Sequence, residues 1–219
     1  MSRIKTDPEL GDKVYAHLRK LQVEPLINPP RMKTAREALA EGLASFFELS
    51  GIDGDDPSTV DSPTRIADMY AEELCVGLDY SNFPKMTAQP NVDGDSEMVM
   101  LSDITTISLC EHHFQTIAGK THIAYIPNKK LLGVSKLARV TNFFMRRPQV
   151  QERMTAQIFY ALQLVLETED VAVQQRCAHF CIRARGVMDP NSMMTTNKLG
   201  GRFMTNPALR QEFLHAIPK

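Results

Sequence analysis

The sequence lacks the features that mark disulfide-rich, membrane-spanning and nucleic-acid-binding proteins. Its 219 residues include only four cysteines, too few for a disulfide scaffold. No segment approaches the roughly 20 apolar residues of a membrane span, and the charged start, MSRIKTDPELGDK, has no apolar run typical of a secretory signal. The net charge of −1 gives no general attraction for nucleic acid or anionic membranes. We therefore expect a cytoplasmic globular protein with neither of these partners.

Helical patterning dominates the first third of the sequence. Apolar residues recur at three- or four-residue spacing within residues 14–21, 34–52 and 65–78, which predicts three helices. For the third of these helices, the expected buried residues are Ile66, Met69 and Leu74.

The patterning then changes to that of strands. Residues 98–109 are rich in Val, Ile and Thr, and residues 120–127 alternate, so we expect a β-hairpin. Two helices follow within residues 135–167, broken near Pro148. Residues 170–186 alternate again, which predicts a further strand.

A loop over residues 188–201 and a last helix opening at Asn206 and Pro207 complete the chain. The predicted fold class is α+β. An N-terminal helical region covers residues 1–95, and residues 96–219 form a domain with an antiparallel sheet and two long antiparallel helices.

Four chemically active side chains stand together in the predicted hairpin connection, namely Cys110, Glu111, His112 and His113. An ordinary solvated loop would instead use Gly, Asn, Asp and Ser. Taken alone, this group fits a surface patch or a buried, hydrogen-bonded histidine as well as it fits a metal or catalytic site.

A second group on the strand predicted for residues 170–186 strengthens the metal interpretation. Cys110 and His113 have the spacing of two ligands from one turn, and Cys181 shares a predicted strand face with His179. Zinc suits thiolate and imidazole together. Three ligands, Cys110, His113 and Cys181, would leave an open position for water, the pattern of a catalytic zinc site. His112 and His179 would then be free to carry protons.

The alternative is a closed structural site with four ligands. Its fourth ligand would be His179 or Cys177. Cys177, on the same predicted face, and Cys75, within a predicted helix, are more typical of packed thiols.

Basic residues form another group. Lys136 and Arg139 lie on one face of a helix whose expected N-cap is Ser135, and a helix N-terminus with cationic neighbours favours anions. Arg185 follows the second cysteine group. Glu152 is a candidate for recognising hydrogen-bond donors, with a surface ion pair as the alternative. The combination indicates a phosphorylated substrate whose reacting centre meets a metal-bound water.

The motifs CEHHF, GKTHIAYIP, GVSKLARV, RPQVQERMT, HFCIRARG and LGG, in this order, resemble those of zinc-dependent GTP cyclohydrolase I. The resemblance extends from about Ser62 to the C-terminus and is strongest from Cys110 to Gly201. It implies the tunnelling fold (T-fold) and a toroidal homodecamer with active sites between subunits. It also implies conversion of GTP and water into 7,8-dihydroneopterin triphosphate and formate, the first step toward folate and other pterins.

The same resemblance assigns roles to individual residues. It implies that zinc is held by Cys110, His113 and Cys181 and that His112 and His179 are the acid/base residues. The other implied site residues are Glu152 with Gln151 for guanine, Arg65, Lys136, Arg139 and Arg185 for the triphosphate, and Ser135 near the ribose.

Two other functions remain open from the sequence. One is a non-catalytic pterin- or nucleotide-binding protein of the same fold with a structural zinc. The other is a related tunnelling-fold enzyme that acts on a different purine or pterin. Turnover of GTP separates all three.

Overall fold

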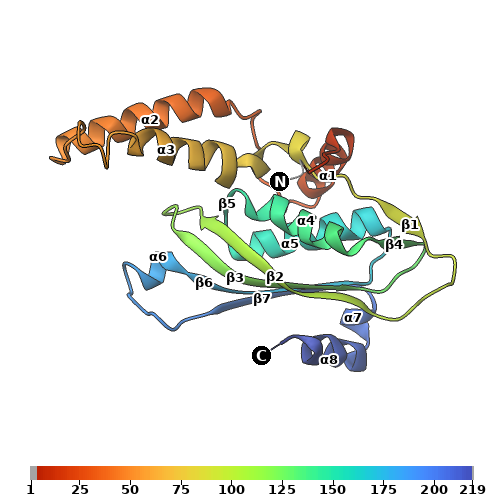
Figure 1. Ribbon diagram of the computed structural model, residues 1–219. Helices are drawn as coiled ribbons and strands as arrows, with labels where there is room; N and C mark the ends of the chain where they lie inside the picture. Colours follow the sequence, from red (N-terminus) through yellow and green to blue (C-terminus); the bar gives the residue numbers. More distant parts are fainter. Residues whose placement is uncertain (1–3, 219) are drawn as a thin grey trace.

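Helices surround a five-stranded sheet in the computed structural model (Figure 1), which describes residues 4–218. The first three residues of the charged start and Lys219 lie outside this range. The α-helices are α1 (Pro8–Lys20), α2 (Met32–Leu49), α3 (Ser62–Asp68), α4 (Val134–Met145), α5 (Gln151–Leu166), α6 (Phe180–Arg183), α7 (Arg202–Thr205) and α8 (Pro207–Ala216). The strands are β1 (Ala88–Pro90), β2 (Val99–Cys110), β3 (Thr116–Tyr125), β4 (Lys130–Leu132), β5 (Pro148–Gln149), β6 (Val171–His179) and β7 (Met194–Leu199). The predicted α+β class is confirmed.

The long strands of the sheet are antiparallel. The strand order is β5-β2-β3-β6-β7, and β2 with β3, β3 with β6 and β6 with β7 pair in antiparallel register. The two-residue β5 instead runs parallel to β2, which places Gln149 opposite Cys110. Leu109 pairs with Thr116, so the predicted hairpin is confirmed and Cys110 lies at its tip.

The main core lies between the sheet and the helix pair α4 and α5. These helices are the pair predicted within residues 135–167, and β5 separates them at Pro148. Met154, Ile158 and Leu162, one face of α5, are fully buried. Each such side chain contributes about 1.5–3 kcal/mol relative to an exposed one. α1 adds Val14 to the same core.

The opposite face of the sheet is covered by α7 and α8 (Figure 1). Phe203 and Phe213 are fully buried there. α8 opens at Asn206 and Pro207 as predicted, with Asn206 as its N-cap, because the Asn206 side chain accepts hydrogen bonds from the backbone nitrogens of Ala208 and Leu209 (3.0 and 3.3 Å).

The predicted strand over residues 170–186 is too long. β6 ends at His179, which pairs with Ile117 near the start of β3, and the chain then forms the single turn α6. A strand needs a hydrogen-bonding partner, and β3 offers none beyond this point. Cys181 therefore lies on a helical turn and not on the predicted strand face.

The loop predicted for residues 188–201 is also wrong in part. Residues 194–199 form β7, which pairs with β6 at the edge of the sheet. An edge strand is half exposed and can carry polar residues such as the TTNK stretch. The sequence therefore has no continuous apolar pattern here that would predict a strand.

The third predicted helix buries a different face. α3 continues into π-helical turns over Met69–Leu74, and the wider turn shifts the buried stripe to Ala67, Ala71 and Cys75. Met69 is exposed, contrary to the prediction, and Ile66 and Leu74 are only partly buried. Cys75 is a packed thiol, as predicted.

Among residues 4–218, the structure contains no helix that combines the length and the apolar character needed to cross a membrane.

Candidate metal centre and active site

Cys110, His113 and Cys181 come together at one end of the sheet. Cys110 is the last residue of β2, His113 lies in the connection to β3, and Cys181 lies on α6. Their candidate ligand atoms all lie within 4.8 Å of one another. The structure therefore brings together the three residues that the sequence suggested as metal ligands, and this cluster can hold a metal ion.

Local backbone hydrogen bonds shape the turn that carries two of these residues. The Cys110 nitrogen donates to the Gln115 carbonyl (2.7 Å), and the Phe114 nitrogen donates to the Cys110 carbonyl (2.8 Å). Phe114 adopts a left-handed conformation with φ of 53°, which reverses the chain. The Glu111 nitrogen donates to the Gln149 carbonyl on β5 (3.0 Å), so the turn is tied to the neighbouring strand.

The ionisation of Cys181 depends on its surroundings in the cluster. Burial raises the pKa of the Cys181 thiol, and the neighbouring Cys110 raises it further, while Arg185 opposes both effects. Two adjacent thiolates repel, so a cation between them favours the deprotonated pair. The donor set thus fits a bound metal.

Cys177 is chemically different from these two cysteines. It is fully buried against Ile117, and burial raises its pKa to about 12. It is therefore a neutral thiol, in agreement with the packing role that the sequence suggested.

Two further histidines lie beside the cluster. The His112 side chain is exposed, with its Nδ1 3.8 Å from the Cys110 sulfur. His179, at the end of β6, lies with its Nε2 2.7 Å from the Gln151 Oε1. Burial lowers the pKa of His179, whereas nearby Glu152 raises it. Glu152 is exposed at the start of α5, so its carboxylate is available to a ligand at this end of the sheet.

The N-cap of α4 differs from the one predicted from the sequence. The N-cap is Gly133 and the helix begins at Val134, so Ser135 is its second residue and not the predicted cap. Lys136 lies in the same turn. Its pKa is lowered by desolvation first and then by the neighbouring cation of Arg139. An anion near this turn would relieve the repulsion between the two cations.

The start of α4 lies far from the metal cluster of the same chain (Figure 1). Near its C-terminal end, Met145 contacts the backbone of Ile107, close to the tip of the hairpin. Just before the helix, the Leu132 nitrogen donates to the Tyr125 hydroxyl at the opposite end of the sheet (3.1 Å). The start of α4, with Ser135 and Lys136, therefore lies toward the opposite end of β2 from Cys110.

The other two predicted phosphate-binding residues are exposed. Arg65, on α3, pairs with Asp61 of its own segment (2.9 Å). Arg185 lies close enough to Cys181 to lower the pKa of its thiol. One chain thus gathers the metal cluster, two histidines, Glu152 and Arg185, but not the residues of α4.

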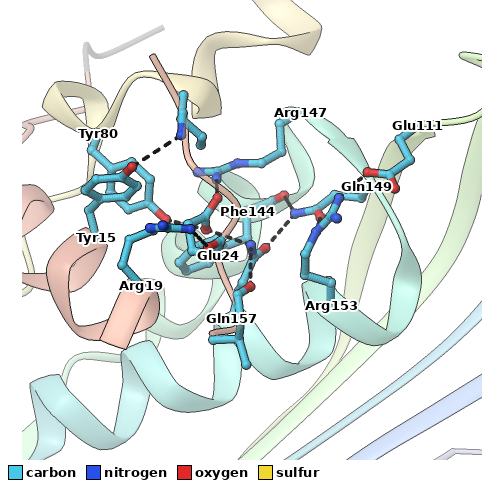
Figure 2. A network of polar contacts seen from close by, with 12 residues as sticks. Tyr15, Arg19, Glu24, Tyr80, Glu111, Phe144, Arg147, Gln149, Arg153 and Gln157 are labelled. Carbon is cyan, nitrogen blue, oxygen red and sulfur yellow. Dashed lines mark hydrogen bonds and ion pairs between the residues drawn. The ribbon is translucent and has the colours of Figure 1, made fainter. Parts of the chain in front are cut away.

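Sequence reasoning missed a polar network that reaches the metal turn (Figure 2). Arg153 forms an ion pair with Glu111, the residue that follows Cys110 in the sequence. The Arg153 Nε also donates to the Gln149 side chain (3.4 Å). Gln149 in turn donates to Gln157 (2.8 Å) and Gln157 to Glu24 (2.6 Å). The available signal was the presence of glutamines on an apolar helix face. Helical periodicity alone, however, does not show which residues pair with them.

Comparison with known proteins agrees with this arrangement. The family model described as GTP cyclohydrolase I matches residues 39–218. A GTP cyclohydrolase 1 from Shewanella baltica (strain OS185) is 46% identical over 209 residues, which cover 94% of this chain and 97% of the relative. A GTP cyclohydrolase 1 from Vibrio cholerae serotype O1 is 48% identical over 195 residues, which cover 89% of each chain. The chain therefore belongs to the GTP cyclohydrolase I family.

Proposed function

We propose that this chain is a zinc-dependent enzyme that converts GTP and water into 7,8-dihydroneopterin triphosphate and formate. Family membership supports the reaction. The observation that carries the proposal is the convergence of Cys110, His113 and Cys181 within 4.8 Å, with His179 close by in sequence and space. A thiol and imidazole cluster of this kind, beside separate proton carriers, suits hydrolysis at a purine ring carbon.

Zinc is the metal that best fits this donor set. Two thiolates and one imidazole are typical zinc ligands, and three protein ligands leave one position open. Bound there, Zn²⁺ supplies a Lewis acid that makes water a nucleophile near neutral pH. Cys177 is a neutral thiol, and the group of candidate ligands that the structure gathers within 4.8 Å among residues 4–218 consists of Cys110, His113 and Cys181, without His179. This grouping argues against a closed structural site.

The two histidines are suited to proton transfer. His112 is exposed next to the cluster, where its ring can deliver a proton to a purine nitrogen as water adds to C8. His179 is half-buried and held by Gln151, so it can serve the later steps, in which formate leaves and the ribose opens. The two imidazoles lie in different environments, one exposed and one half-buried, which suits separate proton-transfer roles in one site.

Guanine recognition is assigned to Glu152. Guanine presents N1-H and the 2-amino group as adjacent donors, and one carboxylate can accept from both. Glu152 lies close enough to His179 to influence its pKa, so the bound base would lie next to a proton carrier. Adenine has an acceptor at N1 and no 2-amino group, and the same carboxylate would repel it.

We also infer that a complete site requires more than one subunit. Ser135, Lys136 and Arg139 lie toward the other end of β2, so they would serve the cluster of a neighbouring chain, with Arg65 as a further contact. This supports a homo-oligomer, for which we propose the toroidal homodecamer. We assign residues 96–219 to the T-fold catalytic domain and residues 1–95 to an N-terminal helical region.

Co-expression of two inactive variants tests the shared site. Cys110→Ser and Lys136→Ala each disable one half of the site. If the halves come from different subunits, mixed oligomers should regain about a quarter of the wild-type activity, because random assembly pairs two intact halves at that frequency. Light scattering should show a large ring. Full activity in a monomer would contradict the assembly, and an absence of regained activity would place both halves in one subunit.

The proposed reaction is tested by incubating metal-loaded protein with GTP. We expect formate and, after oxidation, a fluorescent pterin in equal amounts, with no product from ATP. Consumption of GTP without formate, or no consumption, would contradict the proposal. Release of formate from a different purine but not from GTP would favour the related enzyme instead.

A further inference from the structure

Gln151 lies wholly inside the protein. Its side chain is fully buried at the start of α5. The amide nitrogen Nε2 donates to the carbonyls of Gln175 (3.2 Å) and Met194 (3.1 Å) and to the Thr196 hydroxyl (3.1 Å). Backbone carbonyls can only accept hydrogen bonds, so the nitrogen end of the amide must face β6 and β7. The orientation of this amide is thus determined by the surrounding backbone.

This orientation determines where His179 carries its proton. With its nitrogen facing the two carbonyls, Gln151 presents its Oε1 to the His179 Nε2 at 2.7 Å. An amide oxygen can only accept, so the His179 Nε2 must be the donor. In the neutral ring, the proton then lies on Nε2 and the lone pair on Nδ1.

A buried chain of hydroxyl and amide groups holds Gln151 in place. The Thr155 hydroxyl contacts the Gln151 backbone carbonyl (2.9 Å) and the Gln175 side-chain Oε1 (2.6 Å). The Gln175 Nε2 donates to the Thr121 hydroxyl (2.9 Å), which contacts the Thr106 hydroxyl at 2.6 Å. All of these side chains are buried. Because the acceptors of the Gln151 Nε2 all belong to the protein itself, the orientation of its amide is set before substrate binds.

We propose that Gln151 is a positioning residue, which holds His179 as the Nε2-H tautomer and leaves Nδ1 as its proton-accepting atom. The proposal rests on the proposed function for the identity of the reaction. It replaces the guanine contact that the resemblance implied for Gln151, because this side chain is fully buried and both ends of its amide already have hydrogen-bond partners within the protein. Guanine recognition then falls to Glu152, the next residue, which is exposed.

Kinetics separate positioning from substrate binding. Gln151→Met keeps the size of the side chain but removes the hydrogen bond to His179. We expect kcat to fall about tenfold to a hundredfold, as is usual when the partner of a functional histidine is lost. KM for GTP and zinc content should stay near wild type.

A matched control removes a buried hydroxyl elsewhere. Thr141 is buried on α4 and donates to the Leu137 carbonyl (3.0 Å). Thr141→Val should lower stability without the fall in kcat. An equal fall in kcat in this control would show that the effect of Gln151→Met is general destabilisation. A raised KM with unchanged kcat in Gln151→Met would show a substrate contact. Either result would overturn the proposal.

Solid-state nitrogen NMR reads the tautomer without any turnover. Histidine-labelled, metal-loaded protein would be measured at mildly alkaline pH, where the imidazole is neutral. The His179 signal is assigned by its absence in His179→Gln. We expect the proton on Nε2 in wild type and an altered signal in Gln151→Met. A proton on Nδ1 in wild type would overturn the proposal in an active enzyme. A wild type with the Nε2 proton but no formate release would instead contradict the proposed function and support the role of Gln151.

Discussion

The metal cluster and the buried network around Glu24 both concentrate ionisable groups, but they differ in how fully the chain pairs them. In the network (Figure 2), the Glu24 carboxylate accepts from Arg147 (3.1 Å), Tyr80 (2.7 Å) and Gln157 (2.6 Å). Its partner Arg147 lies 4.9 to 5.2 Å from the ring centroids of Tyr80, Phe143 and Phe144. Glu24 and Arg147 thus have each other as a counter-charge within the same chain, although the Arg147 Nε and Nη2 have no hydrogen-bond partner within residues 4–218.

At the metal cluster the balance is different. Burial and the neighbouring Cys110 raise the pKa of the Cys181 thiol, and exposed His113 completes the group. The ligand atoms lie within 4.8 Å of one another, and Arg185 is close enough to lower the pKa of the Cys181 thiol. The comparison shows that charges paired within the chain stabilise the fold. Ionisable groups that lie together but are incompletely paired are available to bind a ligand. The predictions below test this division.

The largest effect is expected at the metal ligands. Cys110→Ser, His113→Ala and Cys181→Ser should each abolish metal retention and lower formate release by at least about three orders of magnitude, because each removes one of three donors. Metal content measured by mass spectrometry checks this. Cys177→Ser is the control. Loss of metal from this variant would contradict the proposed set of three ligands.

The next largest effect is expected in the interior. Glu24→Gln leaves Arg147 buried without a counter-charge, which should lower the free energy of unfolding by about 3–5 kcal/mol. Formate release per folded molecule should not change. Chemical denaturation measures the loss. Glu167→Gln, which breaks the exposed pair with Lys130, is the control and should have no measurable effect. A Glu24→Gln protein as stable as wild type would show that the network does not hold the fold.

A smaller effect is expected for guanine recognition. Glu152→Gln keeps the shape of the side chain but loses the charge, and a charge-assisted hydrogen bond contributes about 1.5–3 kcal/mol. Losing one such bond lowers kcat/KM for GTP by about tenfold to a hundredfold, and losing both lowers it further. Steady-state kinetics with unchanged metal content check this. Near-normal turnover of GTP would show that Glu152 is a surface residue.

The smallest effect concerns an interior histidine. His122 is buried in β3 and accepts a hydrogen bond from the Asp103 nitrogen (3.2 Å), and burial lowers its pKa in the folded state. Below the unfolded pKa, about 6.5, the unfolded chain binds a proton that the folded chain resists, so stability falls as the pH drops through this value. His122→Gln should flatten that fall between neutral and mildly acidic pH. The same slope in variant and wild type would assign the acid sensitivity to other groups.

The sequence predicted the parts of the molecule that depend on short-range patterns. Three-residue spacing in the hairpin connection placed Cys110 and His113 on one turn, and helical periodicity placed Met154, Ile158 and Leu162 in the core. These patterns repeat within a few residues, so a single sequence carries them.

Long-range partners could not be predicted in the same way. The ion pair of Glu24 with Arg147 joins residues 123 positions apart, and neither position looks unusual in the sequence. The end of β6 at His179 depends on where its partner β3 begins. The burial of Gln151 depends on β7, which was expected to be a loop. Each of these three misses concerns a contact between distant segments.

Zinc titration of metal-stripped wild type, followed by formate release from GTP, tests the central claim most directly. If Cys110, His113 and Cys181 form the catalytic metal centre, formate release should be absent without metal, rise with added zinc and saturate at about one zinc per chain. Stability of the fold should change much less than turnover, because the interior network does not involve the metal. Full turnover by metal-free protein, or saturation of metal binding with no gain in formate release, would contradict the account.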